Sequence, residues 1–107
     1  MSVIDELYSV ILEKKNDPAE GSYTSYLFSA GTDKILKKIG EESAETIIAA
    51  KNEGKEELVG EICDLTYHLL VLMAQKGIDP GEIERILKER RQKIGNLKQF
   101  KNTDKNT

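Results

Sequence analysis

The segment from Leu58 to Ala74 is the feature that most restricts how this chain can fold. Its apolar residues fall on most sides of a helical wheel: Leu58, Val59, Ile62, Cys63, Leu65, Leu69, Leu70, Val71, Leu72 and Met73. A helix that is apolar nearly all round is typical of a central, buried position. We therefore predict a helix from about Lys55 to Lys76 at the centre of the fold, with Cys63 as a buried structural thiol.

Local start and stop signals divide the rest of the chain into further helices. Serine caps, glycine stops and an Asp-Pro start predict helices at about residues 2–15, 22–31, 32–52 and 79–95. The Tyr, Thr and Phe residues of the 22–31 segment would also suit a strand. In the first of these, the helical spacing of Val3, Leu7, Val10 and Ile11 predicts the buried face. We expect an all-α, four-helix-bundle-like domain over residues 1–95, with residues 96–107 as a polar, mobile tail.

Composition excludes several classes of function. The net charge of −3 argues against a nucleic-acid-binding protein, because such proteins normally carry a basic field. The N-terminus has no basic region before its apolar residues, and the apolar run 69–74 is too short to span a bilayer. A single cysteine rules out an intramolecular disulfide and makes a cysteine-based zinc site untenable. We expect a soluble, cytoplasmic protein.

Acidic residues gather on one side of the predicted helix 32–52. Glu41, Glu42 and Glu45 lie within roughly 100° of one another on the wheel, away from the side that carries Ile35 and Ile39. Carboxylates crowded in this way repel one another and weaken an isolated helix by tenths of a kcal/mol per pair. Lys38, on the same arc, compensates only in part, so the cluster calls for another explanation than a solvated face.

The next helix carries a matching polar stripe, in which Glu61, Asp64 and His68 follow one another at spacings of three and four. Burying two unpaired carboxylates costs several kcal/mol, and no Lys or Arg occurs between positions 55 and 76 to pair with them. A short connection favours antiparallel packing of the two helices, which could bring Glu42 and Glu45 opposite the stripe. Four carboxylate ligands suit Mg²⁺ or Mn²⁺; the alternative is a satisfied polar network.

These residues also carry a family resemblance. The pattern Glu41-Glu42-x-x-Glu45 followed by Glu61-x-x-Asp64 resembles the all-α NTP pyrophosphohydrolase (MazG-like) superfamily. The surrounding SYTSYLF, KILKKIGEESAETIIAAK and EICDLTYHLLVLM segments are similar to those of the phosphoribosyl-ATP pyrophosphatase family, and the likeness runs from about Ile4 to Arg91.

The resemblance implies Mg²⁺-dependent hydrolysis of phosphoribosyl-ATP to phosphoribosyl-AMP and pyrophosphate, the second step of histidine biosynthesis. On this view Glu42, Glu45, Glu61 and Asp64 hold the metal, and Glu41 orients the attacking water or takes its proton. The substrate-binding candidates are Lys37, Lys38, Ser22, Tyr23, Thr24 and His68. Tyr23 and His68 could equally be satisfied core residues. The family also implies a homodimer that completes the fold and covers apolar surface.

Two rival functions fit parts of the same pattern. An enzyme that removes canonical or damaged (d)NTPs would need the same acidic site, so the acids do not separate it from a phosphoribosyl-ATP hydrolase. A non-enzymatic helical interaction module would carry the acids as a solvated face. The first rival is tested by its substrates and the second by binding of Mg²⁺ and a triphosphate.

Overall fold

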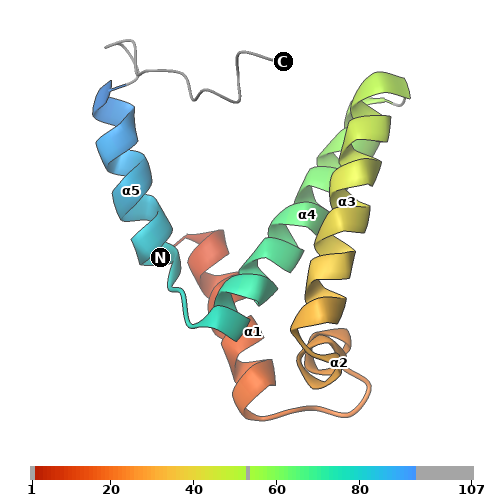
Figure 1. The fold of residues 1–107 in the computed structure, drawn as a ribbon, viewed down its shortest axis with the longest axis vertical. Coiled ribbons are helices and arrows are strands. Elements are labelled where there is room, and N and C mark those ends of the chain that lie inside the picture. Colours follow the sequence, from red (N-terminus) through yellow and green to blue (C-terminus); the bar gives the residue numbers. More distant parts are fainter. Residues whose placement is uncertain (1, 53, 94–107) are drawn as a thin grey trace.

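The computed structural model describes residues 2–52 and 54–93, and over these residues the chain is helical with no strand. The helices are α1 (Val3–Asn16), α2 (Tyr23–Ala30), α3 (Thr32–Asn52), α4 (Lys55–Lys76) and α5 (Pro80–Lys93). The predicted all-α fold is thus confirmed (Figure 1). The expected end of the last helix near Gly95 and the expected mobile tail at 96–107 lie outside the described residues.

Helix boundaries follow the local signals closely. The Ser2 side chain accepts a hydrogen bond from the Asp5 backbone N–H, and the Asp5 carboxylate accepts one from the Ser2 N–H, which makes a reciprocal cap for α1. The Ser22 side chain caps α2 by accepting a hydrogen bond from the Ser25 N–H, without a reciprocal bond. Gly31 and Gly77 end their helices at φ values of 101° and 70°, which a residue with a Cβ adopts only with strain.

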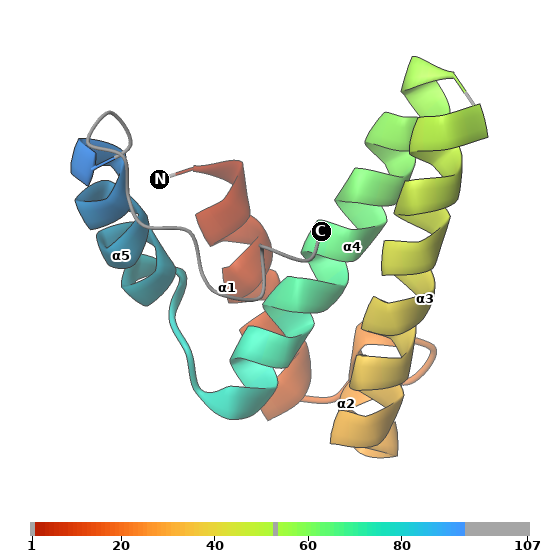
Figure 2. The ribbon, with the colours of Figure 1, turned by 45° about the horizontal axis from the view of Figure 1, so that its top comes forward.

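α3 and α4 form an antiparallel hairpin (Figures 1 and 2). The base of this hairpin is the end where α3 begins and α4 finishes, and α1, α2 and the start of α5 lie near it. α3 and α4 make the most extensive contact between elements. α1 and α2 pack against the part of this hairpin that contains the end of α4 and the start of α3. α5 leaves the end of α4 and diverges from the hairpin, so that the two arms make a V in both views.

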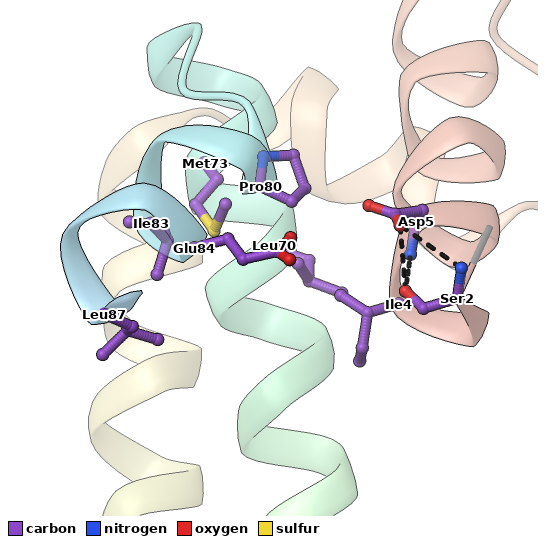
Figure 3. Close-up of a pocket in the computed structure, with 9 residues that line it drawn as sticks. All are labelled: Ser2, Ile4, Asp5, Leu70, Met73, Pro80, Ile83, Glu84 and Leu87. Carbon is purple, nitrogen blue, oxygen red and sulfur yellow. Dashed lines mark hydrogen bonds between the residues drawn. The ribbon is translucent and has the colours of Figure 1, made fainter. Parts of the chain in front are cut away.

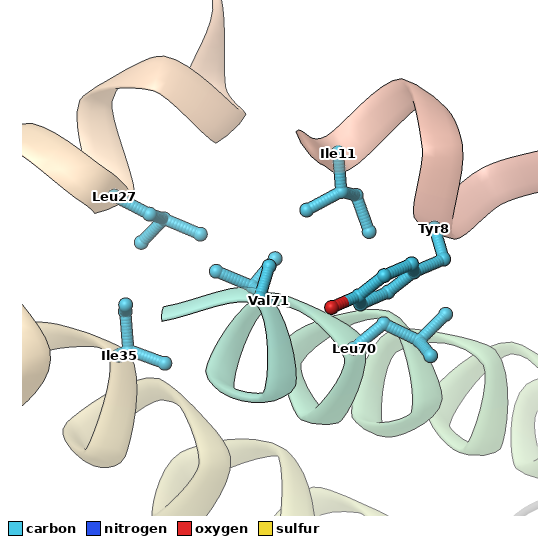
Figure 4. Close-up of a cluster of buried hydrophobic side chains, with 7 residues drawn as sticks. Tyr8, Ile11, Leu27, Ile35, Leu70 and Val71 are labelled. Carbon is cyan, nitrogen blue, oxygen red and sulfur yellow. The ribbon is translucent and has the colours of Figure 1, made fainter. Parts of the chain in front are cut away.

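The core lies where α1, α2 and the base of the hairpin meet (Figure 4). Its buried side chains are Tyr8, Ile11, Leu27, Ile35, Leu70, Val71 and Ala74. Removing an aliphatic side chain of this kind from water contributes about 1.5–3 kcal/mol. The hydroxyl of Tyr8 donates a 2.6 Å hydrogen bond to the carbonyl of Ile78, which joins α1 to the turn between α4 and α5.

The part of the hairpin far from this core, made of the second half of α3 and the first half of α4 and called the hairpin arm below, has many exposed residues, contrary to the prediction for α4. Val59 and Ile62 on α4 and Ile47 on α3 are all exposed, Ile47 to 64%. Cys63 is exposed as well, so its assignment as a buried thiol is wrong. α3 packs along α4, but the buried residues of α4 all lie in its second half, where α1 and α2 add to the packing.

The buried face of α1 also differs from the predicted one. Val3 is 75% exposed and Val10 is exposed too, while Tyr8 and Ile11 enter the core. Spacing alone had selected the aliphatic residues and passed over Tyr8, whose ring is buried and whose hydroxyl is satisfied by Ile78. A tyrosine is compatible with a core when its hydroxyl finds such an acceptor.

An apolar groove of about 330 Å³ lies between the start of α1, the second half of α4 and α5 (Figure 3). Leu70 and Met73 of α4 face Ile83 and Leu87 of α5 across it, and Ile4 closes its α1 side. None of the acidic residues singled out by the sequence lines this groove. Among the described residues, no helix is both long and apolar enough to cross a membrane.

Candidate metal centre

Three carboxylates from two helices converge on the exposed arm of the hairpin. Glu42 and Glu45 lie one turn apart on α3, and Glu61 faces them from α4. One oxygen from each residue lies within 4.8 Å of the other two, a spacing that allows all three to contact a single cation. The convergence follows from the antiparallel packing of α3 on α4, which brings residues before the short turn close to residues after it.

Two oxygens in this cluster are buried without a protein partner. Glu42 is only 7% exposed, and its Oε2 atom has no hydrogen-bond partner among the described residues. The same holds for Oε1 of Glu61. An unsatisfied buried acceptor costs about 1–3 kcal/mol, and more when it is charged. These atoms therefore fit a group that supplies positive charge, and hard oxygen donors fit a divalent cation.

The electrostatics of the cluster agree with this reading. Burial, the hydrogen-bonding contact with the Glu45 carboxyl and the charges of Glu45, Glu42 and Asp64 together raise the pKa of Glu61 to about 6. Burial and the neighbouring Glu45 also raise the pKa of Glu42, with a further contribution from Asp64. The protein without a cation thus holds these carboxylates in an unfavourable environment, which a bound cation would relieve.

The structure puts Asp64 and Glu41 at the edge of this cluster. Asp64 is exposed and is not one of the three converging residues, although its charge acts on Glu42 and Glu61. Glu41 is exposed, and its carboxylate lies 3.1 Å from Nζ of Lys38. The hydrogen bond from Lys38 lowers the pKa of Glu41, and the charges of Lys38, Lys37 and Lys34 lower it further.

Lys38 joins the basic and acidic parts of α3. Its Nζ atom also lies 4.0 Å from Glu42, and its hydrogen bond with Glu41 raises the pKa of the ammonium. Lys37 is exposed and belongs to the same basic turn, close enough for its charge to act on Glu41. A cationic turn thus precedes the acidic cluster along the same helix.

Two candidate hydroxyl groups at the start of α2, those of Ser22 and Thr24, have partners within the protein. The Ser22 hydroxyl oxygen accepts the capping hydrogen bond from Ser25, and among the described residues its hydrogen has no acceptor. The hydroxyl of Thr24 forms a short hydrogen bond with that of Tyr67 on α4. Tyr67 belongs to the EICDLTYHLLVLM segment but is not among the site residues predicted from the sequence, because its partner Thr24 lies 43 positions away and no local pattern connects them.

Tyr23 and His68 form a hydrogen-bonded pair. His68 is 5% exposed, and its Nε2 atom lies 2.9 Å from the Tyr23 hydroxyl. Its Nδ1 atom lies 2.7 Å from the backbone carbonyl of Asp64. The rings of Tyr23, Tyr67 and His68 pack together, with centroids 4.9–6.3 Å apart. The hydroxyl of Tyr23 therefore links α2 to the helix that carries Glu61.

A cluster of acids that can hold a cation, next to a basic turn, is suited to chemistry on phosphate esters and anhydrides. Comparison with known proteins identifies which chemistry. A profile of the family described as phosphoribosyl-ATP pyrophosphohydrolase matches residues 4–91. The chain belongs to this family.

Relatives within the phosphoribosyl-ATP pyrophosphohydrolase family are similar over nearly their whole length. A phosphoribosyl-ATP pyrophosphatase of Clostridium botulinum is 58% identical over 102 residues, which is 95% of this chain and 93% of the relative. One from Streptococcus thermophilus is 46% identical over 89% of this chain and 91% of the relative. The chain also matches 46% of a histidine biosynthesis bifunctional protein HisIE of Lactococcus lactis, at 53% identity.

Proposed function

We propose that this protein hydrolyses phosphoribosyl-ATP to phosphoribosyl-AMP and pyrophosphate, as a cytoplasmic step of histidine biosynthesis. Membership of the phosphoribosyl-ATP pyrophosphohydrolase family supports the substrate. The observation that carries the chemistry is the convergence of Glu42, Glu45 and Glu61, with two buried oxygens that have no protein partner. A triphosphate repels nucleophiles because of its charge, so a hydrolase of this kind must neutralise that charge.

We propose Mg²⁺, or Mn²⁺ in its place, as the cation of this site. Glu42, Glu45 and Glu61 are the ligands that the spacing of their oxygens supports, and Asp64 completes the set from the exposed side. A cation bound there supplies charge neutralisation for phosphate oxygens and a lowered pKa for bound water. The three carboxylates offer only oxygen ligands, so the site favours a hard cation.

Glu41 is proposed to act on the attacking water. The lowered pKa of Glu41 keeps its carboxylate ionised at neutral pH. The carboxylate can therefore accept a hydrogen bond from the water molecule and hold a lone pair of the water oxygen toward phosphorus. In the reaction, the water oxygen bonds to phosphorus at the α–β bridge as the bridging P–O bond breaks and pyrophosphate leaves. The water proton passes to a carboxylate of the site or to solvent.

Cationic and hydroxyl groups beside the acids are proposed to bind the nucleotide. Lys37 and Lys38 attract the phosphate chain as point charges, and Lys38 is already oriented by Glu41. Ser22 is available to donate its hydroxyl hydrogen to a phosphate oxygen while it accepts the capping bond from Ser25. Thr24, His68 and Tyr23 shape the wall of this site from α2 and α4.

We propose that the protein is a homodimer. The exposed apolar residues of the hairpin arm, Ile47, Ile48, Val59 and Ile62, are more than a monomer of this size would leave in water. They lie on the same arm as Glu45 and Glu61, so a second copy that covers them would also narrow the approach to the carboxylates. Packing of the two hairpin arms would give the four-helix bundle that one chain lacks.

A substrate panel tests the proposed function. Purified protein with Mg²⁺ should release pyrophosphate from phosphoribosyl-ATP and not at a comparable rate from canonical or oxidised dNTPs. Preferred turnover of dNTPs would assign it to the house-cleaning activity instead. A protein that binds neither Mg²⁺ nor a non-hydrolysable triphosphate in calorimetry would be an interaction module, and the proposal would fail.

A further inference from the structure

The Tyr23–His68 pair has a direction that the positions of the hydrogen atoms determine. The backbone carbonyl of Asp64 can only accept a hydrogen bond, so Nδ1 of His68 must carry the hydrogen in their 2.7 Å contact. In the neutral ring, Nε2 then has a lone pair and no hydrogen. The 2.9 Å contact with Tyr23 is therefore one in which the tyrosine hydroxyl donates.

This direction limits what the tyrosine can bind. A phenol has one hydrogen, and that of Tyr23 is committed to His68. Its oxygen presents only lone pairs to any further partner. Tyr23 is still half exposed, and it lies close enough to Lys38 and Glu42 for their charges to act on its hydroxyl. The acceptor is thus held at the edge of the proposed phosphate site.

We propose that His68 is a positioning residue that fixes Tyr23 as a hydrogen-bond acceptor for a donor group of the nucleotide, either a hydroxyl of the ATP ribose or the amino group of the base. Phosphate oxygens carry no hydrogen and are excluded as partners of this oxygen. The inference rests on the proposed function for its substrate. It assigns to Tyr23 the nucleoside part of the substrate, while Lys37 and Lys38 hold the phosphates.

Burial supports the positioning role of His68. Its ring is enclosed between Tyr23 and Tyr67, in edge-to-face contacts with centroids at 5.8 and 4.9 Å, and both ring nitrogens have protein partners. It therefore has no free nitrogen for the substrate. The same hydrogen bonds connect the acceptor oxygen to the backbone of Asp64, one helical turn from Glu61, so the nucleoside and metal parts of the site share one rigid frame.

Steady-state kinetics on four substrates test this inference. These are the phosphoribosyl derivatives of ATP, 2′-deoxy-ATP, 3′-deoxy-ATP and the triphosphate of purine riboside, which lacks the amino group. In the wild-type protein, removing the donor that Tyr23 binds should raise KM by about 3- to 10-fold, with kcat changed by less than about twofold. Tyr23→Phe should raise KM for the parent substrate by a similar factor and abolish the discrimination.

Three further variants separate positioning from general structure. Tyr26→Phe is the matched control, because Tyr26 is half exposed on the same helix and its hydroxyl makes no hydrogen bond with any described residue; this variant should behave as the wild type. His68→Leu should lose the discrimination, and His68→Gln should retain part of it, because the amide oxygen can still accept from Tyr23. If His68→Leu does not fold, Tyr23→Phe and His68→Gln still decide.

The outcomes are distinct. Discrimination that survives in Tyr23→Phe, or a Tyr23→Phe loss equal on all four substrates, would overturn the inference. If the wild type releases no pyrophosphate from phosphoribosyl-ATP, the proposed function fails and the inference falls with it. An active wild type that does not discriminate between the four substrates leaves the proposed function intact and overturns only the role of Tyr23.

Discussion

Glu42 and Glu61 each hold a buried carboxylate oxygen that no group of the described chain satisfies, and they belong to opposite helices of one hairpin. Both helices also have faces that are exposed to solvent, so either helix could have carried such a residue on an exposed face instead. The pair is therefore best explained by a ligand that the protein binds. The predictions below follow from this pair and from the residues around it.

Replacing Glu45 by glutamine should lower kcat by about 100-fold or more, because a ligand that stabilises charge in the transition state is worth several kcal/mol. The exposed position of Glu45 means that the variant should fold normally. Pyrophosphate release and calorimetric titration with Mg²⁺ measure the effect. Glu13→Gln, an exposed substitution on α1, should leave both unchanged; an equally active Glu45→Gln would remove Glu45 from the ligand set.

The stability of the metal-free protein should fall as the pH rises from about 4.5 to about 6. The pKa of Glu61 is raised to about 6 in the folded state, so the folded protein binds more protons than the unfolded chain in this window. Stability falls with pH wherever the native state binds the excess. The raised pKa of Glu42 acts in the same direction. Urea unfolding in EDTA across this range measures the slope.

Glu61→Gln supplies the control for that slope. The variant should be more stable than the wild type at pH 7 in EDTA, since it removes a carboxylate that is ionised against its preference. In saturating Mg²⁺ the order should reverse, because the wild type gains the free energy of ion binding. A wild type that stays the more stable in EDTA would contradict the electrostatic description of the cluster.

Lys38→Met should raise KM for phosphoribosyl-ATP by about tenfold, as expected for loss of one charged contact with phosphate. Lys38 is held by Glu41 at 3.1 Å, whereas Lys37 is exposed and forms no ion pair within the described part of the chain, so Lys37→Met should have the smaller effect. Lys51→Met at the end of α3 is the control. Equal KM values for Lys38→Met and Lys51→Met would exclude a substrate role for Lys38.

Ile47→Glu and Val59→Glu should each convert the proposed dimer to monomer at micromolar concentration. Both residues are exposed on the hairpin arm, and a buried charge without a partner costs several kcal/mol at an interface. Light scattering measures the mass. Val10→Glu makes the same chemical change on α1 and should leave the dimer intact. A monomeric wild type with full activity would refute the dimer.

Tyr8→Phe should lower the free energy of unfolding by about 1 kcal/mol, the usual contribution of one hydrogen bond. The substitution keeps the ring in the core and removes only the 2.6 Å bond to the Ile78 carbonyl. Since Tyr8 is far from the carboxylates in the fold, turnover should not change. Chemical denaturation measures the free energy of unfolding, and release of pyrophosphate from phosphoribosyl-ATP measures turnover.

The sequence was informative wherever the signal is local. Ser2, Ser22, Gly31, Gly77 and the Asp79-Pro80 step each act on the backbone next to them, and the helix bounds they predicted are confirmed to within a residue or two. The spacing of Glu42 and Glu45 is local in the same sense. Their meeting with Glu61 could be expected because only a short turn separates α3 from α4.

Features that depend on distant parts of the chain were not predictable in this way. His68 meets Tyr23 across 45 positions, and no periodicity indicates which partner its ring will find. The exposure of Cys63 was missed because the apolar pattern of α4 does not state whether this chain or a second copy covers it. Asp64 shares a stripe with Glu61, yet one turn of helix was enough to leave it exposed.

The position of the cluster on the hairpin has a consequence for how the protein opens. Glu42 lies at the middle of α3 and Glu61 in the first half of α4, in a part of the hairpin that contributes no residue to the buried core cluster. An ion bound by both residues would hold α3 and α4 together in this part of the hairpin. Loss of the ion would allow the backbone amide hydrogens of this part to exchange with solvent far sooner than those near the core. Divalent cation supply would then set not only the rate of hydrolysis but the lifetime of the enzyme against proteases.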